Sequence, residues 1–149
     1  VQQAEWTDLN HDGNPEVTLL VRRPFEPWPV DRILPHGGRI QAHQDAEGMS
    51  SHIIMLGWKK DHWGEVWAGS ALARPVQQFG IADLNRDGKE ELVVMEGNYQ
   101  TKNSAPASSL AVWQWDGFGF ELISRIDKPT NYFKILKTKQ NQEFILIES

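Results

Sequence analysis

Short apolar runs separated by turns make up most of the chain, and no helical pattern accompanies them. A spacing of three to four residues between apolar positions never persists for ten residues, which argues against helices. Residues 92–95 form a continuous apolar run, as in a strand buried on both faces. Similar runs occur at 78–82, 110–115 and 120–124, and a glycine-containing turn at 116–119 joins the last two. The pattern predicts four antiparallel strands in series.

The first half of the chain carries the same series. A nine-residue pattern, Asp-Leu-Asn-x-Asp-Gly-x-x-Glu, follows the first predicted strand of each series, at residues 8–16 and 83–91. With average residue usage, two such copies in one chain have a chance probability on the order of 10⁻⁴. We infer that the two series are repeats. The strands of the first series are predicted at 5–7, 17–21, 52–56 and 65–68.

The repeats differ in length and in completeness. Residues 58–64 match 113–119, and the spacing of the matches gives the first repeat an insertion of about 20 residues within 22–52. Segments at 133–136 and 143–146 match the first two strands of the second repeat. The predicted boundaries are about 4–74 for the first repeat, about 76–128 for the second and about 131–149 for a partial third.

Four-stranded antiparallel units with a period of roughly 55 residues predict an all-β fold made of β-propeller blades. About two and a half blades are present. A propeller closes with typically four to eight blades, so these blades cannot close a ring alone. Further blades in cis or another chain are expected to complete the ring, because the outer sheet faces and strand edges would otherwise be exposed. The alternative is an open stack of blades whose edges are covered.

Oxygen-bearing side chains occupy positions one, three, five and nine of both acidic loops. In a tight loop, side chains at alternate positions converge on one point, and glycine at position six allows the sharp turn. A backbone carbonyl at position seven can complete an all-oxygen cage, which suits Ca²⁺. The predicted donors are Asp8, Asn10, Asp12, the Asn14 carbonyl and Glu16 in the first loop, and Asp83, Asn85, Asp87, the Lys89 carbonyl and Glu91 in the second.

Two other interpretations of these loops explain less. An EF-hand needs a bidentate glutamate at position twelve, but that position is Leu19 in the first loop and Val94 in the second. An Asx turn that only caps a hairpin explains one Asp-Gly pair, but not two patterns with acids at the same offsets. We therefore expect two Ca²⁺ sites. The corresponding loop of the third repeat, residues 137–142, has no acidic residue and is expected to bind none.

The second loop and its flanking strands, residues 79–94, resemble the FG-GAP or VCBS type of calcium-binding repeat found in integrin α-subunit heads and in many bacterial secreted or surface proteins. Residues 113–120 are similar to the hairpin that usually follows. The resemblance implies a β-propeller with calcium loops between the first two strands of each blade. It also implies an extracellular, periplasmic or cell-surface location and a role in adhesion or as a scaffold. The chain departs from the family by lacking the Gly-Ala-Pro segment and by carrying glutamate at position nine.

Composition narrows the class of partner. The 149 residues carry 15 Lys and Arg against 20 Asp and Glu, a formal net charge of −5, which leaves no basic surplus for nucleic acid. No apolar run approaches the roughly 18 residues of a membrane helix, so no membrane insertion is expected. The absence of cysteine excludes disulfides and thiol catalysis.

No catalytic residue is assigned, because a nucleophile elbow, a phosphate loop and a metalloprotease motif are all missing. The sequence predicts a calcium-stabilised, non-catalytic binding or scaffolding module with a protein or glycan partner. The alternative is a carbohydrate-active enzyme or lectin domain that holds a polysaccharide with the first-repeat insertion and aromatic residues. Trp58, Trp63, Trp113 and Trp115 are expected to pack between blades.

Overall fold

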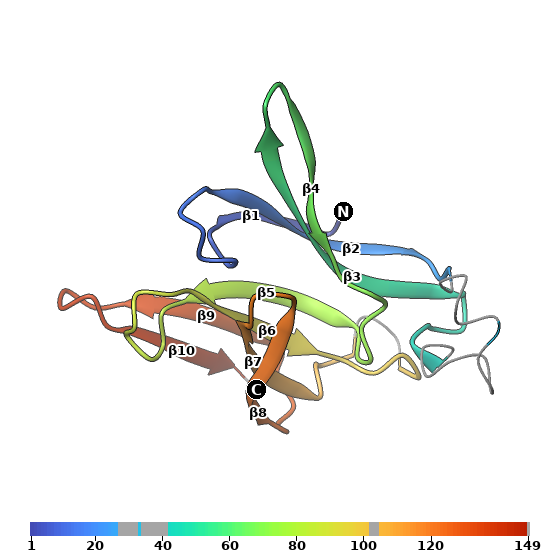
Figure 1. Cartoon of the computed structure of the whole chain (residues 1–149). Helices are drawn as coiled ribbons and strands as arrows, with labels where there is room; N and C mark the ends of the chain where they lie inside the picture. The colour runs from blue at the N-terminus through green and yellow to red at the C-terminus, as the bar shows by residue number, and fades with distance from the viewer. Residues whose placement is uncertain (27–32, 34–41, 102–104, 149) are drawn as a thin grey trace.

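The computed structural model of the protein describes residues 1–26, 33, 42–101 and 105–148. This part of the chain contains ten strands and no α-helix, so the all-β prediction is confirmed. The strands form three sheets in which each strand pairs antiparallel with the next in sequence (Figure 1). The first sheet contains β1 (Gln3–Thr7), β2 (Glu16–Pro24), β3 (Met49–Lys59) and β4 (His62–Ala68). The second contains β5 (Val76–Ala82), β6 (Glu91–Glu96), β7 (Ser109–Trp115) and β8 (Phe120–Ile126), and the third contains β9 (Tyr132–Lys137) and β10 (Glu143–Glu148).

One hydrophobic core lies between the first and second sheets. Leu20 of β2 and Met55 of β3 are fully buried there, against Phe79 of β5 and Val94 of β6. Apolar residues on one face of each sheet alternate with residues on the other face, because side chains of a strand point to opposite sides. The sheets therefore stack face to face.

A second core covers the other face of the second sheet. Val93 and Met95 of β6 pack there with Phe133 of the third sheet, and Ile135 and Ile145 are partly buried against them. As a result all six residues of β6 are buried, which confirms the prediction of a strand covered on both faces. The second sheet is the middle layer of three.

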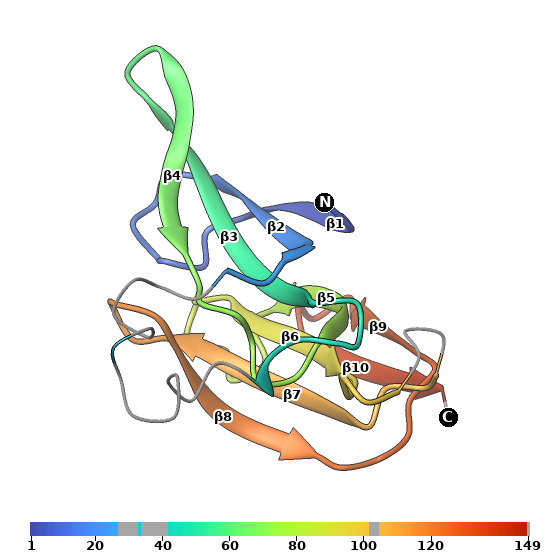
Figure 2. The same cartoon turned by 90° about the vertical axis from the view of Figure 1, so that its right-hand side faces the viewer.

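The hairpin between β3 and β4 corrects the sequence alignment of the aromatic residues. Val17 of β2 pairs with Leu56, whereas the matching Leu92 of β6 pairs with Trp113. Trp58 therefore corresponds to Trp115, two residues from the predicted match. The turns themselves are equivalent, since Trp58 pairs with Trp63 and Trp115 with Phe120, five residues apart in both hairpins. The displacement arises earlier, in the chain between β2 and β3: 39 residues separate Val17 from Leu56, and 21 separate Leu92 from Trp113. The first hairpin extends beyond the rest of its sheet (Figures 1 and 2).

The predicted insertion lies between β2 and β3. These strands pair as far as Pro24 and Met49, three residues beyond the pair that matches Glu96 and Ser109 of the second sheet. The additional residues therefore lengthen both strands as well as the connection at 25–48. Residues 27–32 and 34–41 of it lie outside the described residues.

The described strands do not close into a ring. No strand pairing joins one sheet to another in this part of the chain, and β10 has only β9 as a neighbour. The structure thus consists of stacked antiparallel sheets, and their assignment as propeller blades stays a prediction.

Candidate metal-binding loops

The two acidic loops have the same backbone conformation. Position four is left-handed in both, with φ of 59° at His11 and 64° at Arg86. Position six is also left-handed, with φ of 80° at Gly13 and 83° at Gly88. No atom would lie within 4 Å of a Cβ at either glycine, so the backbone conformation, rather than a lack of space, requires glycine there.

Side chains at positions one, three and five accept backbone N–H groups from further along the same loop. In the first loop, Gly13 donates to Asp8 (3.3 Å), Asp12 to Asn10 (3.0 Å) and Asn14 to Asp12 (2.8 Å). In the second loop, Gly88 donates to Asp83 (3.0 Å), Asp87 to Asn85 (2.9 Å) and Lys89 to Asp87 (2.9 Å). These bonds hold the acidic side chains on the inner side of each turn. These hydrogen bonds do not involve the backbone carbonyls of Asn14 and Lys89, so the role of those two carbonyls as metal ligands stays a prediction.

A buried glutamate closes each loop at position nine. Glu16 is 1% exposed and Glu91 is 2% exposed. One carboxylate oxygen accepts the N–H of position two, from Leu9 or Leu84, at 2.8 Å in both cases. The other oxygen, Oε2 of Glu16 and Oε1 of Glu91, is buried without a hydrogen-bond partner among the described residues. An unpaired buried acceptor costs about 1–3 kcal/mol, and more when charged.

Burial raises the pKa of both glutamates above the ordinary value of 4.5. The N–H of Leu9 opposes this shift at Glu16, and the charge of Asp8 adds to it. At Glu91, the two aspartates of the second loop likewise raise the pKa. A cation placed between these carboxylates would favour their ionised forms.

Three carboxylates of the first loop come close together. Asp8, Asp12 and Glu16 each offer an oxygen, and the three oxygens lie within 4.8 Å of one another. Oxygens on opposite sides of a Ca²⁺ ion are about 5 Å apart, because each Ca–O distance is about 2.3–2.6 Å. This spacing suits one ion.

The carboxylates of the second loop are less well arranged to bind a metal ion than those of the first. The oxygens of Asp83 accept the N–H groups of both Asp87 and Gly88. Within the described ranges, only the first loop brings three carboxylates together at the spacing given above. Asn10 and Asn85 donate to the neighbouring aspartate of their own loops, at 3.2 Å in both cases. The side chains of the second loop would therefore have to move closer together before three carboxylates could contact one ion.

Two glutamates that sequence reasoning missed tie the loops to the neighbouring sheet. The N–H of Asp8 donates to Glu90, directly before β6 of the second sheet, at 3.0 Å. The N–H of Asp83 donates in the same way to Glu143 of the third sheet at 2.6 Å. Glu143 thus takes the place of Glu90, one position from the predicted match with Glu91.

Two glutamines form a further repeated contact between sheets. Gln3 donates to the carbonyl of Phe79 at 2.8 Å and accepts its N–H at 3.0 Å. Gln78 donates to the carbonyl of Phe133 at 3.2 Å. Both glutamines stand five residues before an acidic loop. That common offset is the signal that could have identified them.

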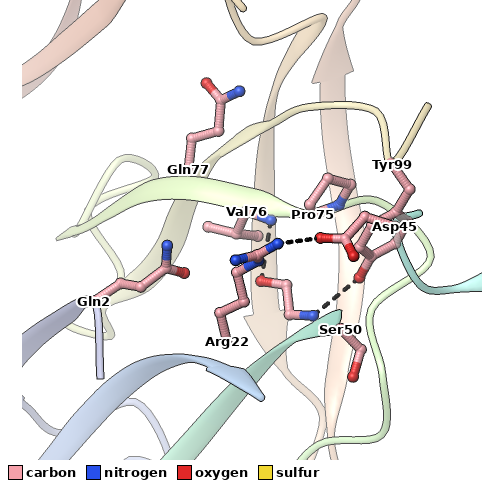
Figure 3. A pocket seen from close by; sticks show the side chains of 9 residues that line it. Gln2, Arg22, Asp45, Ser50, Pro75, Val76, Gln77 and Tyr99 are labelled. Carbon is pink, nitrogen blue, oxygen red and sulfur yellow. Dashed lines mark hydrogen bonds and ion pairs between the residues drawn. The ribbon is translucent and has the colours of Figure 1, made fainter. Parts of the chain in front are cut away.

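A small polar pocket lies between the first two sheets, away from the acidic loops (Figure 3). Its volume is about 90 Å³. Arg22 pairs with Asp45 there, and the Tyr99 hydroxyl accepts the N–H of Ser51 at 3.0 Å and donates to the carbonyl of Leu72 at 2.9 Å. The Tyr99 hydroxyl thus connects the β6–β7 segment to the backbone of the first sheet and of the chain that follows it.

The tryptophan prediction is only half correct. Trp113 and Trp115 pack against the core between the first two sheets. Trp58 and Trp63 are 60% and 45% exposed, because no described sheet covers the outer face of the first sheet.

Comparison with known proteins assigns no family to the chain. No family model, curated protein or solved structure matches the chain. In the described residues no helix is long and apolar enough to cross a membrane. The fold and the loops define an antiparallel β protein with two acidic turns of the same conformation.

Proposed function

We propose that the chain is a calcium-stabilised, non-catalytic binding or scaffolding module made of FG-GAP/VCBS-like repeats. The observation that carries this proposal is the burial of Glu16, which has one unpaired oxygen and whose carboxylate clusters with those of Asp8 and Asp12. An anionic oxygen held away from water needs a compensating partner. The equivalent oxygen of Glu91 supports a second site.

Calcium suits these loops better than other cations. Every candidate ligand is an oxygen atom, and each loop offers three carboxylates to balance two positive charges. Mg²⁺ usually keeps several water molecules and needs a stricter octahedral arrangement. Softer transition metals prefer nitrogen or sulfur ligands.

Substitution of one aspartate in each loop tests the assignment. Isothermal titration of the unaltered chain with Ca²⁺ is expected to give two ions per chain. Asp12→Ala and Asp87→Ala should each remove one ion, because each removes a carboxylate from one loop. Lys139→Ala is the matched control in the third loop and should leave the stoichiometry unchanged. Three ions in the unaltered chain, or loss of a site only in the double variant, would contradict the proposal.

The outer face of the first sheet supports a place in a larger propeller. Trp58 and Trp63 contact at 5.6 Å and 78°, and the corresponding Trp115 and Phe120 contact at 5.3 Å and 76°. Trp67 of the first sheet packs edge-on against both Trp115 and Phe120, and so covers this pair of the second sheet. The pair in the first sheet has no such cover among the described residues. We infer that another blade, in cis or from another chain, covers it.

The module is proposed to act outside the cytoplasm, in an extracellular, periplasmic or cell-surface setting, with a protein or glycan partner. The resemblance to the calcium-binding repeats supports this location.

Self-association of the 149-residue chain is the expected result of the uncovered face. Trp6 is 61% exposed, and its ring centroid lies 5.6 Å from that of Trp63. Trp6, Trp58 and Trp63 therefore form one apolar patch. Light scattering at micromolar concentration should detect oligomers. Trp58→Lys should raise the concentration needed for association about tenfold.

Ile123→Lys is the matched control for that experiment, because Ile123 of β8 is an exposed apolar residue, 54% exposed, on a different strand. It should leave association unchanged. A monodisperse monomer in the unaltered chain would mean that no further sheet is needed to cover this face.

A further inference from the structure

An apolar cavity of about 330 Å³ opens between the first and second sheets. Its base consists of Ile53, Val76, Leu92 and Val94, none of which is more than 6% exposed. Pockets that bind small molecules have volumes of about 300–1,000 Å³ and mostly apolar walls. The cavity therefore has the size and lining of a binding pocket.

Aromatic rings line part of this cavity. Trp67 from the first sheet and Trp113 and Phe120 from the second all contribute to its wall. The rings of Trp67 and Phe120 contact each other edge-on at 5.3 Å and 79°. Flat apolar surfaces of this kind favour a ligand with an aromatic or other compact apolar body.

The polar part of the lining contains two arginines and one glutamate. Glu96, 3% exposed, accepts from Arg125 at 2.7 and 2.9 Å and from Ser109 at 2.9 Å. Both of its oxygens are thus occupied. Arg74 lies 3.7 Å from Glu96, so two guanidinium groups face one carboxylate inside the cavity.

Arg74 retains donor groups for a ligand. Its Nη1 atom donates to Ser109 at 2.9 Å and lies 3.4 Å from Asp127, which is 76% exposed and lies outside the cavity lining. No acceptor among the described residues contacts its Nη2 atom. A guanidinium with free N–H groups binds carboxylates through paired, charge-assisted hydrogen bonds.

We propose that this cavity binds a small carboxylate with an aromatic or compact apolar body, with the body against Trp67, Trp113 and Phe120 and the carboxylate on Arg74. Glu96 and its partners supply no free acceptor for a cationic group. A neutral ligand would make no charge-assisted contact with the unpaired Nη2 group of Arg74. The proposal does not depend on the acidic loops or on calcium.

Three matched indole compounds test the proposal: anionic indole-3-acetate, neutral indole-3-acetamide and cationic tryptamine. Titration of the ¹⁵N-labelled chain, followed by NMR and calorimetry, should give one saturable site for indole-3-acetate. The shifted amide signals should belong to lining residues such as Leu72, Val94 and Phe120. Tryptamine should bind at least about tenfold more weakly, since its charge repels the guanidinium groups.

Two arginine variants separate the charge contact from general effects. Arg74→Gln should weaken indole-3-acetate roughly fivefold or more and leave indole-3-acetamide unchanged. Arg23→Gln, at an exposed arginine of β2 outside the cavity, removes the same charge and should change neither. The amide spectrum of each variant verifies that the fold is intact.

Three results would overturn the proposal. The first is no saturable binding of indole-3-acetate at millimolar concentration. The second is equal affinity for all three compounds with no effect of Arg74→Gln, which would mean that only the apolar walls act. The third is that the shifted signals belong to the patch around Trp58 and Trp63.

Discussion

Calcium at a hundred times its dissociation constant is expected to raise the free energy of unfolding by about 2.7 kcal/mol for each occupied loop. The unfolded chain does not hold three carboxylates together, so the ion binds the folded state far better. With two loops occupied, the melting temperature should rise by about 10–20 °C, because 1 kcal/mol corresponds to about 2–4 °C for a domain of about 150 residues. Thermal scans in chelator and in millimolar Ca²⁺ measure the difference.

Magnesium at the same concentration serves as the control for ionic strength and divalent charge. Its effect should be smaller, since the loops provide a cage for a larger and more flexible ion. Identical melting in chelator and in Ca²⁺ would remove the basis for both sites.

Glu16→Gln is expected to change stability in opposite directions with and without calcium. Without the ion, the variant should be more stable at neutral pH by about 1 kcal/mol or more, because the amide is neutral and its N–H groups can donate to Asp8. With the ion, the variant should gain only the stabilisation from the second loop. Chemical denaturation in chelator and in Ca²⁺ measures both effects.

The same substitution should change the pH dependence of the metal-free protein. Burial raises the pKa of Glu16 above 4.5, so between that value and the raised pKa the folded state binds more protons than the unfolded state. Stability from this group therefore falls as pH rises through the window, and Gln removes the slope. Glu121→Gln, at an exposed position of β8, is the control and should keep the slope. A Glu16→Gln protein that is less stable without metal and still binds two ions would contradict the assignment.

The strands and the loop conformation could be predicted from the sequence because both depend on local patterns. Continuous apolar residues at 92–95 require cover on two faces, and Gly13 and Gly88 mark the left-handed position of each turn. The register of the β3–β4 hairpin could not be predicted, because Asp61 and Gly64 match Asp116 and Gly119 in sequence but not in strand pairing.

Contacts between sheets were also beyond sequence reasoning. Whether Gln3 reaches the backbone of Phe79 depends on how two sheets stack, and a glutamine before a polar loop has no single role. The buried state of Glu16 was equally hidden, since a glutamate at the start of a strand is usually solvated. The spacing of oxygen-bearing residues identified the candidate metal ligands. Only the structure shows that three carboxylates cluster in the first loop and not in the second.

The glutamates that join each loop to the next sheet have a mechanical consequence. Glu90 is the sequence neighbour of Glu91, so an ion that fixes the second loop also fixes the acceptor for the N–H of Asp8 in the first. Relative rotation of the two sheets would stretch this bond. Metal occupancy is therefore expected to stiffen the stack under tension, with part of the load passing from one sheet to the next through the carboxylates at the loop ends.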